Sequence, residues 1–283
     1  MPVTALINRK GGVGKTTLTL ALADFLAARH ALRILVIDLD PQANSTLELL
    51  GEERWYELEK GGWTLADLFM NVRKGDDYDA HQLIESARTT VIDTLGQIDL
   101  LPASPRLLDE EEELGGDGGA WRYLSGSPLL IMHQAFNEIV RGYDHVLIDC
   151  PPSLGVITMN GLLLSDGFLV PTIPDHISTV GIAQVIGKIR EQFKVMRRKI
   201  NYCGLILNRF DRQTRLHSAI AEEMKSRADY RPVWDTYVPR TVRAEEGHGR
   251  HARQTLASRY GGAQSPYFLA LESLAREFRR RVG

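Results

Sequence analysis

Apolar positions along this chain of 283 residues form short continuous runs, separated by longer segments with helical spacing. Short runs rich in β-branched residues predict buried strands, and longer segments with helical spacing predict helices. The predicted strands are residues 2–8, 34–38, 97–104, 145–148, 167–174, 201–210 and 232–240. The predicted helices are residues 18–30, 178–196 and 264–281, and a short one that starts within 64–69. Because strands alternate with helices, we expect an α/β fold with a doubly wound, mostly parallel sheet and helices on both faces.

The remaining pattern shows no internal repeat and no clear linker, which predicts one domain over residues 1–283. The middle region, residues 51–127, is the least regular part of the chain. It contains the acidic stretch 109–121, which favours an exposed helix end followed by a flexible loop. We assign no function to that stretch, since acidic runs are most often solvated.

The segment NRKGGVGKTT, residues 8–17, connects the first predicted strand to the first predicted helix. Glycines permit backbone angles that let successive amide N–H groups face one anion, and a helix N-terminus adds partial positive charge. Strand, glycine-rich loop and helix together are the context of a P-loop NTPase. The usual pattern G-x-x-x-x-G-K-[ST] has glycine where this chain has Arg9, so this loop is a variant that opens with Lys10.

A P-loop of this kind predicts ATP and Mg²⁺ as cofactors. Lys15 is expected to reach the β- and γ-phosphates, and the Thr16 hydroxyl is expected to ligate Mg²⁺. The alternative is a glycine-rich turn without a ligand. The loop residues expected to bind nucleotide are Lys10, Gly11, Gly12, Val13, Gly14, Lys15, Thr16 and Thr17.

Carboxylates follow two of the predicted strands. Asp38 is the last residue of the run 34–38, and Asp40 lies two residues after it. Asp149 follows the run 145–148. Ligands of open α/β sheets bind at the carboxyl ends of the strands, so these side chains should lie near the glycine loop. Asp149 is a candidate for holding Mg²⁺, directly or through water. The alternatives are that these carboxylates cap the loops that follow them.

Composition excludes several classes of protein. The chain is 43% hydrophobic and 25% charged, as in an ordinary globular protein, and no stretch is apolar enough to span a membrane. The first predicted strand starts at Pro2, so we expect neither a signal peptide nor a helix-turn-helix extension before the loop. Two cysteines, Cys150 and Cys203, make a disulfide framework unexpected and fit a reducing cytoplasm.

Charge is unevenly distributed along the chain. The net charge is −2, but residues 181–283 carry 21 Lys and Arg against 10 Asp and Glu. This basic C-terminal third is what a surface that binds a polyanion needs, although scattered solvated charges are the alternative.

Four motifs then occur in a characteristic order: KGGVGKTT (10–17), DLDPQANST (38–46), LIDCPPSLG (147–155) and VPRTVRAEE (238–246). With them, the chain resembles the ParA/Soj branch of the ParA/MinD ATPases, which carry a deviant Walker A P-loop. The resemblance runs from about residue 2 to 278. It implies a P-loop NTPase fold and an ATPase that turns over slowly until DNA and a partner protein stimulate it.

The resemblance also implies roles for single residues. Lys10 would reach the ATP of a second subunit, so that ATP is held between two chains and dimerisation depends on nucleotide. Catalysis would then involve Lys10, Lys15 and Asp40, with Asp40 orienting the attacking water. Asp149 corresponds to the Walker B aspartate, and Asp38 would lie near Mg²⁺ or the switch. The metal set is therefore Thr16, Asp38 and Asp149.

The resemblance also implies contacts at the base end of the nucleotide site. Asn208 and Pro239 fall where the family contacts adenine. The segment Asn208-Arg209-Phe210 departs from the threonine-methionine pair that is more frequent in the ParA branch.

The family's cycle implies a homodimer that binds non-specific DNA with ATP and leaves it after hydrolysis. Such a cycle segregates a plasmid or chromosome, or positions another large cargo, with a ParB-like or other adaptor protein as partner. The expected location is the bacterial cytoplasm, on the nucleoid. The DNA-binding candidates are Lys188, Arg190, Lys194, Arg197, Arg198, Lys199, Arg212, Arg215, Arg240 and Arg243.

Other functions are weighed against this one. A MinD-like ATPase would bind a membrane through a C-terminal amphipathic helix, and Leu274 and Phe278 stand four residues apart among arginines. We expect DNA rather than a membrane, because the tail has few large apolar residues. Iron–sulfur relatives need cysteine ligands, but this chain has no C-x-x-C. A metabolic ligase, a tyrosine kinase or a dimer without hydrolysis are further alternatives.

Overall fold

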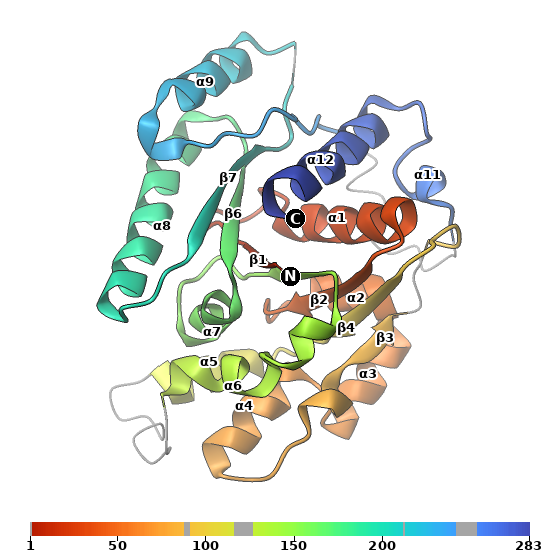
Figure 1. The fold of residues 1–283 in the computed structure, drawn as a ribbon, viewed down its shortest axis with the longest axis vertical. Coiled ribbons are helices and arrows are strands. Elements are labelled where there is room, and N and C mark those ends of the chain that lie inside the picture. The colour runs from red at the N-terminus through yellow and green to blue at the C-terminus, as the bar shows by residue number, and fades with distance from the viewer. Residues whose placement is uncertain (1, 88–90, 116–126, 212, 242–253) are drawn as a thin grey trace.

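The computed structural model describes residues 2–87, 91–115, 127–211, 213–241 and 254–283. Within these residues, seven strands form one sheet in the order β3-β4-β2-β5-β1-β6-β7 (Figure 1). Their bounds are β1 Val3–Leu6, β2 Arg33–Asp38, β3 Glu85–Ala87, β4 Gln97–Leu101, β5 His145–Asp149, β6 Gly167–Thr172 and β7 Asn201–Leu207. All neighbours pair in parallel except β3 and β4, which are antiparallel. The predicted mostly parallel α/β sheet is therefore confirmed.

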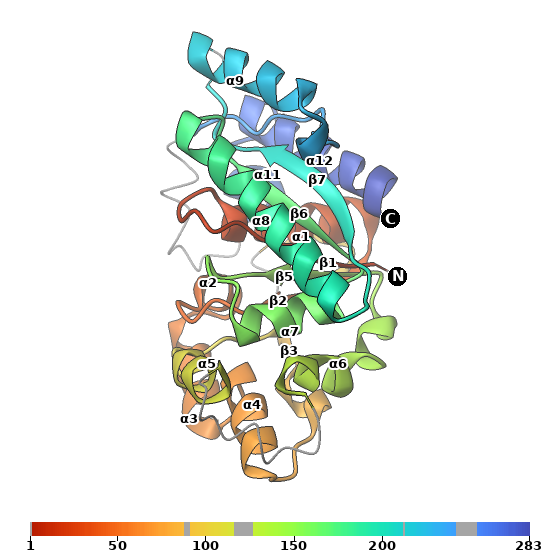
Figure 2. The same ribbon diagram turned by 90° about the vertical axis from the view of Figure 1, so that its left-hand side faces the viewer.

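Helices cover both faces of the sheet (Figures 1 and 2). The α-helices are α1 Lys15–His30, α2 Asn44–Leu50, α3 Glu52–Gly61, α4 Leu65–Lys74, α5 Leu107–Gly115, α6 Ile131–Phe136, α7 Val156–Leu164, α8 His176–Val195, α9 Arg215–Ser226, α11 Leu256–Arg259 and α12 Pro266–Val282. Short 3₁₀ turns lie at Ala80–Leu83, Pro128–Leu130, Ile139–Gly142 and Ala228–Tyr230. One face packs against α1, α11 and α12, and the other against α4 to α9. No helix in the described ranges has the length and apolar content needed to cross a membrane.

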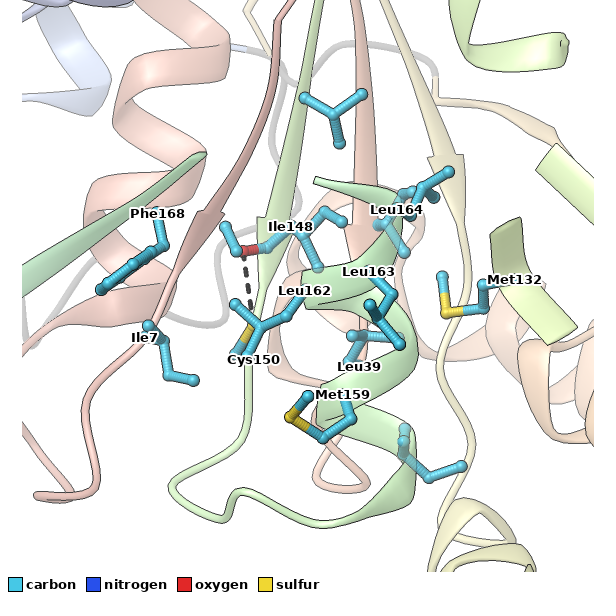
Figure 3. Packing of buried hydrophobic residues seen from close by; sticks show 14 of the residues in the cluster. Ile7, Leu39, Met132, Ile148, Cys150, Met159, Leu162, Leu163, Leu164 and Phe168 are labelled. Atoms are coloured by element: carbon cyan, nitrogen blue, oxygen red, sulfur yellow. Dashed lines mark hydrogen bonds between the residues drawn. The ribbon is translucent and has the colours of Figure 1, made fainter. Parts of the chain in front are cut away.

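The central strands are buried because both of their faces are covered. Figure 3 shows α7 packed on this core, with Leu162 and Leu163 beside Ile148. Gly161 lets the helix approach closely, since a Cβ there would meet Leu39 Cδ1 at 2.4 Å. Cys150 is fully buried in the same cluster, and burial raises the pKa of its thiol.

Several parts of the structure differ from the sequence prediction. Residues 232–240 form no strand; Val233 and Pro239 make isolated bridges to β7 and Phe210. Proline cannot donate to a ladder, and Pro232 and Pro239 stand near the two ends of that run. The pattern also missed α3 and the three-residue edge strand β3, because the middle region combines glycines with polar residues and gives no clear period.

The acidic stretch 109–121 was expected to be an exposed helix end and a flexible loop. In the structure, its first part belongs to α5, and Glu110 is 4% exposed and bound to Arg73 through two hydrogen bonds of 2.8 Å. The helix end is present, and Asp109, Glu112 and Glu113 on it are exposed. Glu110 is the exception, because a cation on α4 lets the helix bury its carboxylate. Residues 116–121 lie outside the described residues.

Candidate functional site

The glycine loop joins the carboxyl end of β1 to the first turn of α1. Gly14 is the N-cap of α1, with φ of 88°, in the left-handed region that favours glycine. Space requires glycine there as well, since a Cβ would stand 2.2 Å from Nδ2 of Asn208. The sequence therefore places the loop backbone directly against the end of β7.

Asn208 and Arg209 contact the loop from β7. Nδ2 of Asn208 donates to the carbonyl oxygen of Val13 at 2.8 Å, and Nη1 of Arg209 donates to that of Gly12 at 3.1 Å. Asn208 and Pro239, which the resemblance assigns to adenine contacts, both line a cavity beside the loop. Sequence reasoning had treated Arg209 only as a departure from the family pattern.

The metal candidates meet at the first turn of α1. Oδ2 of Asp149 accepts hydrogen bonds from the Thr16 hydroxyl at 2.7 Å and from the Ser45 hydroxyl at 2.8 Å. Oδ1 of Asp149 is buried and has no hydrogen-bond partner among the described residues. A buried carboxylate oxygen beside a hydroxyl suits Mg²⁺, which is usually held by one or two carboxylates together with water and substrate phosphates. Ser45 was not identified as a site residue, because nothing in the sequence places it against Asp149.

Asp38 and Asp149 are paired in register on the neighbouring strands β2 and β5. Burial, and then the nearby Asp149, raises the pKa of Asp38 well above its ordinary value. Burial also raises the pKa of Asp149, to about 6, although the Thr16 and Ser45 hydroxyls and the Lys15 ammonium act in the opposite direction. Two buried carboxylates side by side favour the approach of a cation.

The two aspartates of the DxD segment have different environments. Both oxygens of the buried Asp38 accept hydrogen bonds: Oδ2 from the amide and hydroxyl of Thr46, and Oδ1 from the amide of Asp40. These hydrogen bonds cap the segment that follows β2, and they hold the first turn of α2 in place. Asp40 is half-buried and lines the cavity, where its Oδ1 accepts from the Gln42 amide.

The two lysines of the loop lie in different surroundings. Lys15 is only 8% exposed and is the first residue of α1. Lys10 extends instead to Asp175, just before α8, with Nζ 2.6 Å from Oδ2 and side chains that are 33% and 30% exposed. Nothing in the sequence pointed to Asp175 as a partner of Lys10.

A cavity of about 570 Å³ opens beside the loop. A volume of this size is typical of small-molecule sites. Its walls include Gly11, Gly12, Gly14, Lys15, Thr16, Thr17, Asp40, Pro151, Asn208, Arg209, Pro239 and Tyr267. The middle region contributes Leu107, Leu108 and Glu111 of α5 to the same cavity. Glu111 also accepts hydrogen bonds from the Val156 and Ile157 amides, at 2.7 and 2.8 Å, and so caps α7.

The structure separates the DNA-binding candidates into two groups. Those on and just after α8 are all exposed: Lys188, Arg190, Lys194, Arg197, Arg198 and Lys199. Residues 197–199 lead into β7 and so lie at the amino edge of the parallel sheet, whereas the exposed Arg215 and Arg240 follow β7 and lie at the edge of the glycine loop. Arg212 and Arg243 lie outside the described residues.

Known proteins resemble this chain in sequence and in fold. A family described as an AAA domain matches residues 1–202. The sporulation initiation inhibitor protein Soj of Bacillus subtilis is 30% identical over 250 residues, which cover 88% of each chain. The chromosome-partitioning ATPase Soj of Thermus thermophilus is 30% identical over 244 residues, covering 86% of this chain and 82% of the relative.

Among solved structures, the fold is similar to cobyrinic acid a,c-diamide synthase of Mycobacterium smegmatis with bound ATP analogue and magnesium. The TM-score is 0.73 at 24% identity, over 99% of this chain and 95% of the other. At that identity, the likeness shows a common fold.

Proposed function

This chain belongs to the ParA/Soj family of partition ATPases, and from that premise we propose that it is an ATP-dependent positioning ATPase. In this proposal it dimerises around ATP, binds non-specific DNA as the dimer and is released by hydrolysis. The observation that carries the proposal is the cavity beside the glycine loop, with Lys15, Thr16 and Asp40 in its wall and Lys10 near by. The proposed place of action is the nucleoid in the bacterial cytoplasm.

ATP and Mg²⁺ fit the residues of this site. Lys15 and the glycines of the loop line a cavity of a size typical of small-molecule sites. The Thr16 hydroxyl lies beside Asp149, whose second oxygen has no hydrogen-bond partner among the described residues, and together they would hold the metal. Bound Mg²⁺ would supply positive charge that offsets the negative charge of the phosphates. Asp38 then acts by fixing α2, and so the position of the Ser45 hydroxyl on Asp149, rather than by reaching the metal itself.

Dimerisation is inferred from the second lysine. The pair between Lys10 and Asp175 is about one-third exposed, and such pairs contribute little stability. Lys10 can therefore exchange Asp175 for the more highly charged phosphates of a second subunit's ATP. A cation supplied from a second chain stabilises the transferring phosphoryl group in the manner of an arginine finger.

Hydrolysis is assigned to Asp40, which lines the cavity and is half-buried. Asp40→Ala is expected to lower ATP turnover about a hundredfold, because a positioned acid–base group contributes on this scale. The variant should still form the ATP dimer and stay on DNA, as measured by phosphate release and by the lifetime of the DNA complex.

Asp40→Asn is the matched control for this experiment. Its side-chain oxygen can still accept the Gln42 amide, so the turn is kept while the carboxylate charge is removed. We expect it to fold like the wild type and to be as slow as Asp40→Ala. Rapid release of either variant from DNA would contradict the role of Asp40 in orienting water.

DNA binding is assigned to the group on and after α8. A dimer that shares nucleotide across the glycine loop covers the carboxyl edge of the sheet, which leaves the amino edge exposed. Phosphate contacts need charge rather than sequence-specific geometry, so exposed lysines and arginines suffice.

The double charge reversal R197E/R198E is expected to weaken binding of the ATP dimer to random duplex DNA. It should also lower the slope of log affinity against log salt by about one unit for each DNA phosphate that the variant no longer neutralises. R215E/R240E makes the same change of charge at the opposite edge of the sheet and should leave the slope closer to the wild-type value. If R215E/R240E has the larger effect, the DNA surface lies at the carboxyl edge instead.

The membrane alternative is disfavoured by the position of α12. Leu274 and Phe278, the apolar pair of the tail, are fully buried in the cluster with α1. They are therefore not available to enter a lipid surface while the helix is packed. Co-sedimentation with duplex DNA and with anionic liposomes, in ATP, ADP or neither, tests the proposal. ATP-dependent, salt-sensitive binding to DNA supports it, and binding to liposomes alone would overturn it.

The partner and cargo follow from the same proposal. A slow ATPase needs a stimulating protein if release is to be timed, and a ParB-like or other cargo adaptor supplies that role in this proposal. A ligand that binds one state of a protein in preference to the others shifts the equilibrium by mass action, so nucleotide and adaptor set the lifetime of the DNA-bound dimer.

A further inference from the structure

Two consecutive carbonyl groups of the glycine loop are held by two consecutive residues after β7. The Val13 carbonyl accepts from Asn208 and the Gly12 carbonyl accepts from Arg209, at separations of 195 and 197 residues along the chain. The backbone of Asn208 is itself fixed, because its backbone N–H donates to the Thr172 carbonyl of β6 at 2.7 Å. The sheet therefore supports the loop from one side through these two side chains.

The direction of a carbonyl also fixes the direction of the next amide. In a trans peptide group, the C=O and N–H bonds point to opposite sides. When Arg209 holds the Gly12 carbonyl, the Val13 N–H points away from Arg209; likewise, Asn208 directs the Gly14 N–H. Neither N–H donates a hydrogen bond to any residue that the structure describes. Both donors are therefore oriented by these two side chains, and the glycines on either side of Val13, Gly12 and Gly14, line the cavity.

Arg209 holds this position in a strained backbone conformation. Its φ is 52°, in the left-handed region that residues with a Cβ avoid, and arginine has no short polar side chain that would make this region easier. Such strain persists where surrounding structure imposes it, and it gathers at functional sites. Here the residue is half-buried, lines the cavity and reaches the phosphate loop.

We propose that Arg209 is a positioning residue for the phosphate loop, which holds the Gly12 carbonyl so that the Val13 N–H is directed at a nucleotide phosphate. The inference rests on the proposed function, because it assumes that the loop binds ATP and ADP. It also gives a role to the Asn208-Arg209-Phe210 segment, which departs from the family pattern. Loop amides serve the phosphates that ADP and ATP share, so both nucleotides should depend on Arg209.

Arg209→Gly separates this role from a contribution to folding. Glycine relieves the left-handed strain and removes the guanidinium, so the nucleotide-free variant should melt at or above the wild-type temperature. Its dissociation constants for fluorescent ADP and ATP analogues with Mg²⁺ should both rise about tenfold, the usual effect of removing one charged hydrogen bond. Arg209→Asn, which tolerates the same φ, serves as the second variant and should behave in the same way.

Each possible result of the titrations and the melting experiments has a different meaning. Unchanged dissociation constants in both variants would overturn the inference, and so would melting temperatures that fall together with affinity, as expected of a purely structural residue. A loss confined to the ATP analogue would also overturn it, since it would indicate direct contact with the γ-phosphate. A wild-type chain that binds neither nucleotide would overturn the proposed function and this inference with it.

Discussion

Replacing Lys15 by alanine is expected to abolish nucleotide binding at micromolar concentrations, with a loss of affinity of about a hundredfold or more. Lys15 is only 8% exposed at the start of α1, and its ammonium group is close enough to Asp149 to oppose the rise of that carboxyl's pKa. Removing one partner of a desolvated charge pair typically weakens binding by this amount or more. Titration with fluorescent ADP and ATP analogues measures the loss.

Lys60→Ala is the matched control for that experiment. Lys60 is an exposed lysine in the last turn of α3, so the change of net charge is the same and the site is left intact. Melting of the nucleotide-free variants separates a binding defect from a folding defect. Wild-type affinity in a folded Lys15→Ala variant would remove the glycine loop from the nucleotide site.

Replacing Lys10 by alanine is expected to have a different effect, because its ammonium group is paired with Asp175 and does not line the cavity. The variant should bind nucleotide within a few-fold of wild type but remain a monomer with ATP, where the wild type forms a dimer. The physical reason is that the phosphates of the partner's ATP lose the cation that neutralises them across the interface. Light scattering after size exclusion, with a slowly hydrolysed ATP analogue, measures the mass.

Asp175→Asn provides the complementary variant. It leaves Lys10 in place and removes the carboxylate 2.6 Å from it, so ATP-dependent dimerisation should be kept or increased. An ATP dimer in the Lys10→Ala variant would show that the second lysine does not join the two subunits. Loss of the dimer in both variants would indicate that the pair itself, and not the lysine acting alone, builds the interface.

Much of the fold could be predicted because its determinants are local. Continuous apolar runs gave β1, β2, β5, β6 and β7 their approximate positions, and helical spacing gave α1, α8 and α12 within a few residues. The prediction failed where local signals conflict. The run 232–240 is apolar enough for a strand, but its prolines prevent regular pairing, and α3 is a polar helix between glycines that resembles a loop in the sequence.

The candidate site was partly predictable for the same reason. Strand, glycine loop and helix are consecutive in sequence, so Lys15 and Thr16 had to lie at a helix N-terminus. Parallel strands bring their carboxyl ends to one edge, so Asp38, Asp40 and Asp149 had to approach the loop. Those inferences require only the direction of each strand and the spacing of apolar residues along the sequence.

The contacts that orient the site were decided by tertiary structure. Ser45 meets Asp149 across 104 residues, Lys10 meets Asp175 across 165, and Arg209 meets Gly12 across 197. Each depends on which strands are neighbours and on how closely they pack, and no local pattern in the sequence carries that information. The sequence alone thus determined the elements and the chemistry available at their ends. Only the packed sheet determined which polar groups meet, because a hydrogen bond requires a close donor–acceptor approach, and for residues far apart in the sequence the packing of the core sets that distance.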